Sequence, residues 1–157
     1  MLELDLSTEA DTLTLARALA EVVQGGDVIG LEGGLGAGKT TFTRGAVHGL
    51  GVPEETPVTS PTFALLHQYE GRLPIVHADL YRLGDAVELE DLGIEELLED
   101  GAVLFVDWGR KFSDIAERTS LRVDVELVSD VARRARLQPQ GARGDAIIGA
   151  LRHHLSA

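Results

Sequence analysis

Cysteine is absent from this 157-residue chain, and so is any long apolar run. Without cysteine there is no disulfide and no thiolate metal site, which fits a cytoplasmic location. No stretch approaches the roughly 18 consecutive apolar residues of a membrane-spanning helix, so we expect no contact with a membrane. Residues 1–5 also lack the basic and apolar regions that open a secretory signal.

Basic residues are scarce: 14 Lys and Arg stand against 26 Asp and Glu, which gives a formal net charge of −12. Phosphate backbones repel a protein of this charge, so we expect any contact with nucleic acid to be indirect. The charge is uneven, because residues 1–109 carry a net −15 and residues 110–157 a net +3. The acidic part is either ordinary solvated surface or a face that meets a basic partner.

The length and the order of elements predict a single α/β domain over residues 1–157. Apolar residues at helical spacing predict helices over 9–24, 39–50, 85–100 (irregular at Gly93) and 144–155. Short apolar or alternating runs predict strands over 28–31, 63–69, 73–78, 102–106, 121–128 and 135–138. Because strands alternate with helices, we expect a mostly parallel sheet, and residues 135–138 are expected to pair with the strand before them. Thr8 is placed to cap the first helix, with Asp11 three residues on.

Residues 33–40 read Gly-Gly-Leu-Gly-Ala-Gly-Lys-Thr and match the phosphate-binding pattern G-x-x-x-x-G-K-[ST] in full. A predicted buried strand precedes the pattern and a predicted helix follows it, as the pattern requires. The glycines allow backbone N–H groups to face phosphate oxygens, and the helix N-terminus adds its dipole. Lys39 would then contact the β- and γ-phosphates, and the Thr40 hydroxyl would ligate Mg²⁺. The alternative is a glycine-rich turn beside a surface lysine.

Two aspartates end apolar strands, Asp79 after residues 75–78 and Asp107 after residues 103–106. Ligands of open α/β sheets bind at the carboxyl ends of strands, so both are candidates for the metal side of the site, Asp107 the stronger. The alternative is that each carboxylate only caps a loop. His77, within an apolar strand, is interpreted as a satisfied core histidine, and no spacing of His or Asp predicts a dedicated metal cage.

Trp108 is the single tryptophan of the chain and directly follows Asp107. Two interpretations stay open at this point. The indole packs in the core, or it lies near the nucleotide because the chain bends between Val106 and Gly109.

Four blocks of residues, in their order and spacing, resemble the bacterial TsaE (YjeE) family, the ATPases needed for threonylcarbamoyladenosine modification of tRNA. The blocks are Leu35–Phe42 with Arg44-Gly45, Val58–Leu65 with Tyr69, His77–Leu83 with Glu88-Leu89, and Asp107-Trp108. The second and third blocks are specific to the family, whereas the phosphate-binding pattern is shared by many proteins. The resemblance covers about residues 5 to 110 well and the remainder weakly.

The resemblance implies a single-domain, three-layer P-loop NTPase fold with a mostly parallel central sheet and a C-terminal antiparallel portion. It also implies Mg²⁺-dependent ATP hydrolysis, slow without partners. The implied catalytic residues are Lys39, Asp79, Asp107 and Trp108, and the implied metal ligands are Thr40, Asp107 and Asp79. The implied ATP-binding residues are Thr8, Gly34, Leu35, Gly36, Ala37, Gly38, Lys39, Thr40, Thr41, Thr62 and Arg133.

The resemblance further implies that the Ser60-Pro61-Thr62 loop acts as a switch near the γ-phosphate. It implies a partner, the TsaD–TsaB pair, which holds the tRNA and transfers the carbamoyl group, so that tRNA is met only through partners. The ATPase step is expected to reset that complex and not to perform the transfer itself.

The chain departs from the family pattern at two positions. Asp107 stands where the family usually has Glu, which withdraws the carboxylate by about 1.5 Å, one carbon–carbon bond. A misplacement of about 1 Å can cost roughly 10²-fold in rate, so the strand end shifts, a water bridges the gap, or hydrolysis is slower. Gly34 also replaces the usual Asp after the first glycine of the loop.

Other functions of a P-loop fold are weighed by what they would add. A small-molecule kinase would add an arginine-rich lid, whereas only Arg72 and Arg82 lie between Arg44 and Arg110. A GTPase would carry an Asn-Lys-x-Asp sequence, and its absence favours ATP. A nucleotide-dependent scaffold that does not hydrolyse ATP stays open, because Asp107 is shortened.

Overall fold

The structure is a computed structural model that describes residues 1–34, 36–61 and 65–156. Within them, seven strands form one mixed sheet in the order β1-β7-β6-β2-β5-β4-β3. The strands are β1 (Leu2–Leu6), β2 (Val28–Glu32), β3 (Leu66–Glu70), β4 (Pro74–Asp79), β5 (Val103–Asp107), β6 (Leu121–Leu127) and β7 (Arg133–Pro139). Central pairs β2–β5, β2–β6 and β4–β5 are parallel, whereas β6–β7, β1–β7 and β3–β4 are antiparallel. The predicted α/β fold, with a mainly parallel centre and an antiparallel C-terminal portion, is confirmed.

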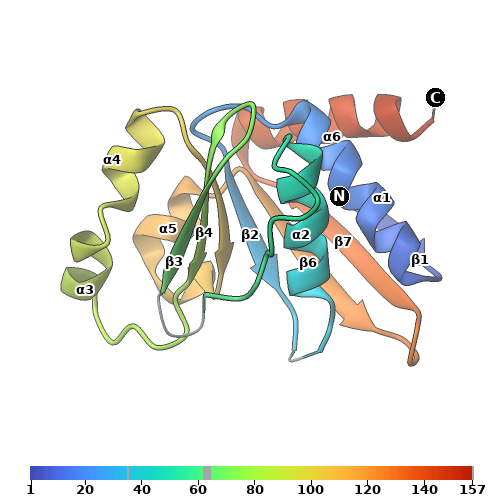
Figure 1. Ribbon diagram of the computed structural model, residues 1–157, viewed down its shortest axis with the longest axis horizontal. Coiled ribbons are helices and arrows are strands. Elements are labelled where there is room, and N and C mark those ends of the chain that lie inside the picture. Colours follow the sequence, from blue (N-terminus) through green and yellow to red (C-terminus); the bar gives the residue numbers. More distant parts are fainter. Residues whose placement is uncertain (35, 62–64, 157) are drawn as a thin grey trace.

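Helices cover both faces of the sheet and complete three layers (Figure 1). One face carries α1 (Glu9–Val22), α2 (Lys39–Gly49) and α6 (Gly141–Leu155). The other carries α3 (Ala86–Asp91), α4 (Ile94–Glu99) and α5 (Ser113–Arg118), with the short 3-10 turn η1 (Gly109–Lys111) beside them. Figure 1 shows α5 on the side of the sheet that lies away from α2.

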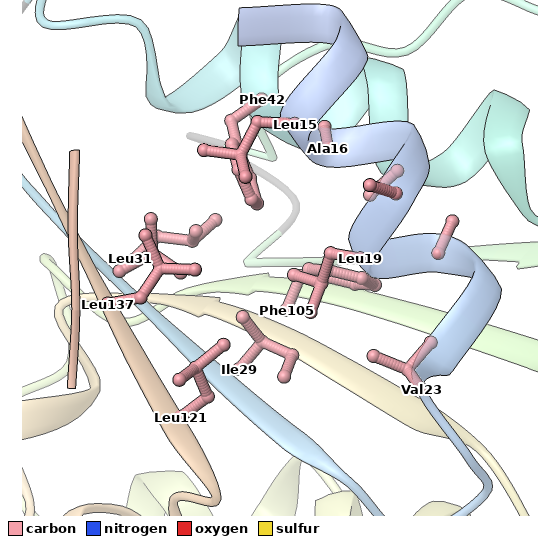
Figure 2. Packing of buried hydrophobic residues seen from close by; sticks show 14 of the residues in the cluster. Leu15, Ala16, Leu19, Val23, Ile29, Leu31, Phe42, Phe105, Leu121 and Leu137 are labelled. Atoms are coloured by element: carbon pink, nitrogen blue, oxygen red, sulfur yellow. The ribbon is translucent and has the colours of Figure 1, made fainter. Parts of the chain in front are cut away.

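Strand β5 shows how the two cores are separated. Successive side chains of a strand point to opposite faces, so Val103 and Phe105 join the core under α1 and α2, while Leu104 and Val106 join the other. All five residues of β5 are buried, as expected of a central parallel strand. In Figure 2, Leu19 of α1 packs against Phe105. The same alternation directs the last residue of β5, Asp107, toward the face that α2 covers.

Helix α1 begins with the predicted cap, which is confirmed. The Thr8 hydroxyl accepts a hydrogen bond from the Asp11 N–H at 3.3 Å, and the Asp11 carboxylate accepts from the Thr8 N–H at 3.2 Å. At its other end, Arg72 from the turn between β3 and β4 donates to the carbonyl oxygens of Ala20 and Val23. These bonds satisfy carbonyls that a helix end leaves unpaired.

Three regions differ from the sequence predictions. Strand β1 was not predicted; Leu2 and Leu4 do alternate with acids, but its partner β7 lies at the other end of the chain. The acidic segment 85–100 is two short helices and not one, because Gly93 takes the left-handed conformation (φ 71°) and starts α4. Helix α5 and η1 also lacked a clear apolar period. The predicted strand 63–69 is described from Leu66 onward as β3, and residues 63 and 64 lie outside the described residues.

No helix in the described ranges has both the length and the apolar character needed to cross a membrane.

Candidate nucleotide-binding site

The phosphate-binding loop joins the end of β2 to the start of α2, and two glycines show why it needs this sequence. A Cβ on Gly33 would lie 2.5 Å from the carbonyl oxygen of Val125 on β6, so no larger residue fits there. Gly38 has a φ of 107°, which side-chain-bearing residues rarely adopt, and it is the N-cap of α2. The loop is therefore folded back tightly against the end of β6. Leu35, predicted to contribute to this cradle, lies outside the described residues.

The N-terminus of α2 is left open for an anion. The first N–H groups of an α-helix have no partner within the helix, and the N-cap residue of α2, Gly38, has no side chain that could cap them. Lys39 is the first residue of the helix, and Thr40 and Thr41 follow in its first turn. The helix dipole and the free N–H groups favour a negatively charged group at this end.

Asp79 and Asp107 lie side by side at the carboxyl ends of β4 and β5, as predicted from the strand ends. Asp107 is also the register partner of Leu31, the residue before the end of the P-loop strand β2. The Asp79 Oδ1 accepts a hydrogen bond of 3.0 Å from the Tyr81 N–H. Asp107 is 4% exposed, and its Oδ1 is buried without a hydrogen-bond partner among the residues that the structure describes.

The oxygen donors at this edge fit Mg²⁺. A hydroxyl (Thr40) and two carboxylates (Asp79 and Asp107) are hard ligands of the kind that Mg²⁺ prefers. In the described part of the chain, no three His, Asp or Glu side chains form a cage for a metal ion. The hydroxyl and the two carboxylates nevertheless suit Mg²⁺, because this ion is commonly held by one or two carboxylates together with substrate phosphates and water.

Trp108 lies beside the phosphate-binding loop and not in the core. Its left-handed backbone (φ 64°) turns the chain at the end of β5, and its side chain is 41% exposed. The Lys39 Nζ lies 5.3 Å from the centre of the indole, within range of a cation–π interaction, and the Tyr81 ring is 4.9 Å away. Of the two interpretations of Trp108, burial in the core is thus excluded. Tyr81 was not singled out from the sequence.

Arg133, at the start of β7, holds the backbone of the phosphate-binding loop. Its guanidinium donates to the carbonyl oxygens of Ala37 at 3.0 Å and Gly36 at 3.4 Å, and also to that of Ser129. The Ala37 carbonyl shares its peptide unit with the Gly38 N–H, so a fixed carbonyl also fixes the direction of that N–H, whereas the Ala37 N–H already donates to the Gly34 carbonyl oxygen at 3.1 Å. The contact joins residues 96 positions apart, which no local pattern could indicate.

A pocket of about 120 Å³ lies next to Arg133. Its lining residues are Glu9, Thr12, Gly38, Thr41, Asp130, Val131 and Arg133. Thr41 and Arg133 are thus brought together, while Thr8 caps α1 immediately before Glu9. Sequence reasoning missed Glu9 and Thr12 of α1 and Asp130 and Val131 of the turn between β6 and β7, two segments that are far apart in the sequence. Thr62, predicted in the switch loop, lies outside the described residues.

His77 is a core residue, as expected, but it is not satisfied. Its side chain is fully buried, and both ring nitrogens lack a hydrogen-bond partner in the described residues. The nearest charged group is Asp107, whose Oδ2 lies 3.7 Å from the His77 Nε2, just beyond hydrogen-bonding distance.

Glu32, the last residue of β2, was not predicted either. Burial raises the pKa of its carboxyl above the ordinary value; Arg110 opposes this effect, and Asp124 adds to it. It lies immediately before the loop, with its Oε1 buried and unpaired among the described residues.

Comparison with known proteins gives a consistent result. A family profile described as threonylcarbamoyl adenosine biosynthesis protein TsaE matches residues 6–135. A TsaE protein of Bacillus subtilis is 36% identical over 145 residues, which cover 92% of this chain and 89% of that protein. One from Streptomyces coelicolor is 45% identical over 128 residues, covering 78% of this chain and 84% of that protein.

A solved structure agrees with these matches. The crystal structure of YdiB from Bacillus subtilis superposes with a TM-score of 0.77 at 30% identity, covering 98% of this chain and 95% of that one. The shared sheet, the intact phosphate-binding loop and the match over most of the chain together establish that this protein belongs to the TsaE family.

Proposed function

We propose that this protein binds ATP with Mg²⁺ and hydrolyses it in support of threonylcarbamoyladenosine modification of tRNA, acting with a TsaD–TsaB-type complex. The observation that supports the proposal best is the Asp107 Oδ1, buried without a hydrogen-bond partner among the described residues, at the same edge of the sheet as the N-terminus of α2, in a chain of the TsaE family. An N–H cradle and a free carboxylate suit a phosphate chain with a divalent cation.

Each residue of the site has a physical role in this proposal. The backbone N–H groups of residues 38–40 hold the phosphates, and Lys39 neutralises their charge. Thr40, Asp79 and Asp107 supply oxygen ligands on the metal side. Mg²⁺, when bound, neutralises charge that develops on the phosphate oxygens. Asp107 also orients the attacking water, which requires that one of its oxygens be free.

The test of nucleotide binding is Lys39→Ala, measured by calorimetry with ATP and Mg²⁺. The substitution removes a charge-assisted contact, so we expect affinity to fall by about 100-fold or more. Lys111→Ala is the matched control, because Lys111 is the other lysine of the chain, is exposed, and donates to the Tyr81 carbonyl. Equal affinity in wild type and Lys39→Ala would refute the proposed site.

A nucleotide-dependent scaffold without hydrolysis is the second candidate, and the shortened side chain of Asp107 is the observation that favours it. Release of phosphate from ATP, measured with and without the TsaD–TsaB pair, separates the two. Turnover that rises with the pair supports the ATPase. Tight binding with no turnover in either condition supports the scaffold.

The acidic side of the molecule is the proposed docking face. A groove of about 650 Å³ runs between α3, α4 and α5, and its floor includes the apolar side chains of Leu89, Ile94 and Ile115. The carboxylates that line it are Glu90, Glu95, Glu96, Asp114 and Glu117. The one arginine at the groove, Arg118, already pairs with Glu95 at 3.3 Å. The negative charge and the apolar side chains of the groove suit a partner surface that is basic and offers an apolar side chain. The same negative charge repels the phosphate backbone of tRNA from this side.

A further inference from the structure

The buried imidazole of His77 carries an inference beyond nucleotide binding itself. A fully buried polar side chain normally has a hydrogen-bond partner, because leaving it unpaired is costly. Both ring nitrogens of His77 lack one among the described residues. An apolar residue would fill the same place at no such cost, as Ile75 does two residues earlier on the same face of β4.

The surroundings of His77 place it behind the proposed metal site. Its register partners are Phe105 on β5 and His67 on β3. By strand alternation, its side chain points to the face covered by α2, which is also the face of Asp107. The Thr43 hydroxyl of α2, on this same side, is likewise buried and unpaired within the described part of the chain.

The distance between His77 and Asp107 shows what the imidazole can do. Nε2 lies 3.7 Å from the Asp107 Oδ2, so a small rotation of either side chain closes a hydrogen bond. In that bond the neutral imidazole donates its Nε2–H and the carboxylate accepts. One oxygen of Asp107 is then fixed, and Oδ1, which is the unpaired one, stays free.

We propose that His77 is a positioning residue that orients the Asp107 carboxylate for the magnesium–nucleotide complex. The proposal rests on the proposed function of Asp107 as a metal-side acid. It also explains how an aspartate, which is shorter than the glutamate usual in the family, can serve at position 107. A hydrogen bond from a neighbouring residue to a metal-binding side chain fixes the orientation of that side chain and changes its affinity for the metal. An aspartate that His77 holds in this way would gain in fixed orientation what it lacks in length.

The experiment compares His77→Leu with His77→Gln in the full-length protein. Leucine has no donor, whereas glutamine keeps an N–H donor at about the distance of Nε2. ADP affinity is measured by calorimetry with and without Mg²⁺, and thermal unfolding is recorded for each variant. We expect His77→Leu to lower the Mg²⁺-dependent gain in ADP affinity by about tenfold, with Mg²⁺-free affinity unchanged and the gain largely restored in His77→Gln.

A double-mutant cycle with Asp107→Asn tests whether His77 acts through Asp107. If His77 acts through Asp107, His77→Leu changes nothing further in the Asp107→Asn background. Losses that add, or equal losses with and without Mg²⁺, overturn the proposal. If His77→Leu does not fold, His77→Met, which also lacks a donor and has a more adaptable side chain, takes its place in the same cycle. Failure of the wild type to bind ADP, or ADP binding that ignores Mg²⁺, would instead refute the proposed function, whereas a Mg²⁺-dependent gain that His77→Leu leaves unchanged would refute only the role of His77.

Discussion

Two buried aspartates lie at opposite ends of the sheet, and their surroundings differ. Asp27, just before β2, and Asp107, at the end of β5, are each 4% exposed. The Asp27 carboxylate accepts from the Gln24 N–H at 2.7 Å and from two nitrogens of Arg143 at 2.8 Å each. The Asp107 carboxylate has one oxygen unpaired among the described residues and the other 3.7 Å from His77.

The difference separates a structural carboxylate from a functional one. Hydrogen bonds from Arg143 to Asp27 raise the pKa of the guanidinium, and the pair joins α6 to the turn before β2. Both oxygens of Asp27 are thus engaged, by three hydrogen bonds within the protein. Asp107 keeps bonding capacity, which is what a site for a cation or a water molecule requires.

The largest expected effect is on stability, from Asp27→Ala. The substitution leaves the Gln24 N–H and the Arg143 guanidinium, whose side chain is 33% exposed, without their acceptor, so we expect a loss of about 2–3 kcal/mol in the free energy of unfolding. Asp5→Ala is the matched control, because its pair with Arg134 is exposed to solvent and should contribute little to stability. Chemical denaturation measures both. Similar losses at the two sites would remove the structural half of the comparison.

Asp107 should show the reverse, a loss of activity without a loss of stability. We expect Asp107→Asn to lower ATP hydrolysis by roughly 100-fold, since the neutral amide neither holds the metal nor activates water, while the unfolding midpoint stays the same or rises. Asp107→Glu should raise hydrolysis by restoring the longer side chain of the family. If Asp107→Glu hydrolyses ATP no faster than the wild type, the site is already adjusted to aspartate. The proposed contact of His77 with Asp107 would then explain the adjustment.

Exposed carboxylates form a third class, and they should affect association only. Neutralising Glu90, Asp91 and Glu96 is expected to slow association with the TsaD–TsaB pair several-fold at low salt and leave ATP affinity alone, because long-range charge steers encounter. The triple change Glu21→Gln, Glu55→Gln and Glu70→Gln, at exposed positions elsewhere, removes the same charge. Surface plasmon resonance over a salt titration compares them, and identical rates would refute docking at α3 and α4.

Glu32 gives the smallest expected effect. Its raised pKa means that the folded state disfavours the ionised form. Glu32 therefore lowers the stability of the fold at pH values above the ordinary glutamate pKa, and this loss vanishes at pH values below it. Glu32→Gln should therefore raise the melting temperature slightly at neutral pH, and the gain should disappear as the pH falls through that range. A gain that is constant with pH would contradict burial as the cause. A fall in ATP affinity would place Glu32 with Asp107.

The sequence predicted the parts of the site whose signals are local. The loop, the start of α2 and the acids at the strand ends are each visible within a few residues, and so was the bend at Trp108. The Arg133 contact with Ala37, the approach of His77 to Asp107 and the Asp27–Arg143 pair were not predictable, because each depends on segments brought together only by the sheet. Strand β1 was missed for the same reason.

The hydrogen bonds of Arg133 connect the phosphate-binding loop to the turn between β6 and β7, so a change in one can affect the other. The guanidinium holds the Ala37 carbonyl, and the N–H of the same peptide unit, that of Gly38, would face a bound phosphate, so Arg133 and the phosphate would restrain this peptide unit from its two sides. The turn after β6 is closed by hydrogen bonds from the N–H groups of Val128 and Ser129 to the Ala132 carbonyl. If a phosphate group fills the loop, we expect solvent exchange of those two amide protons to slow, because Arg133 joins their turn to the loop.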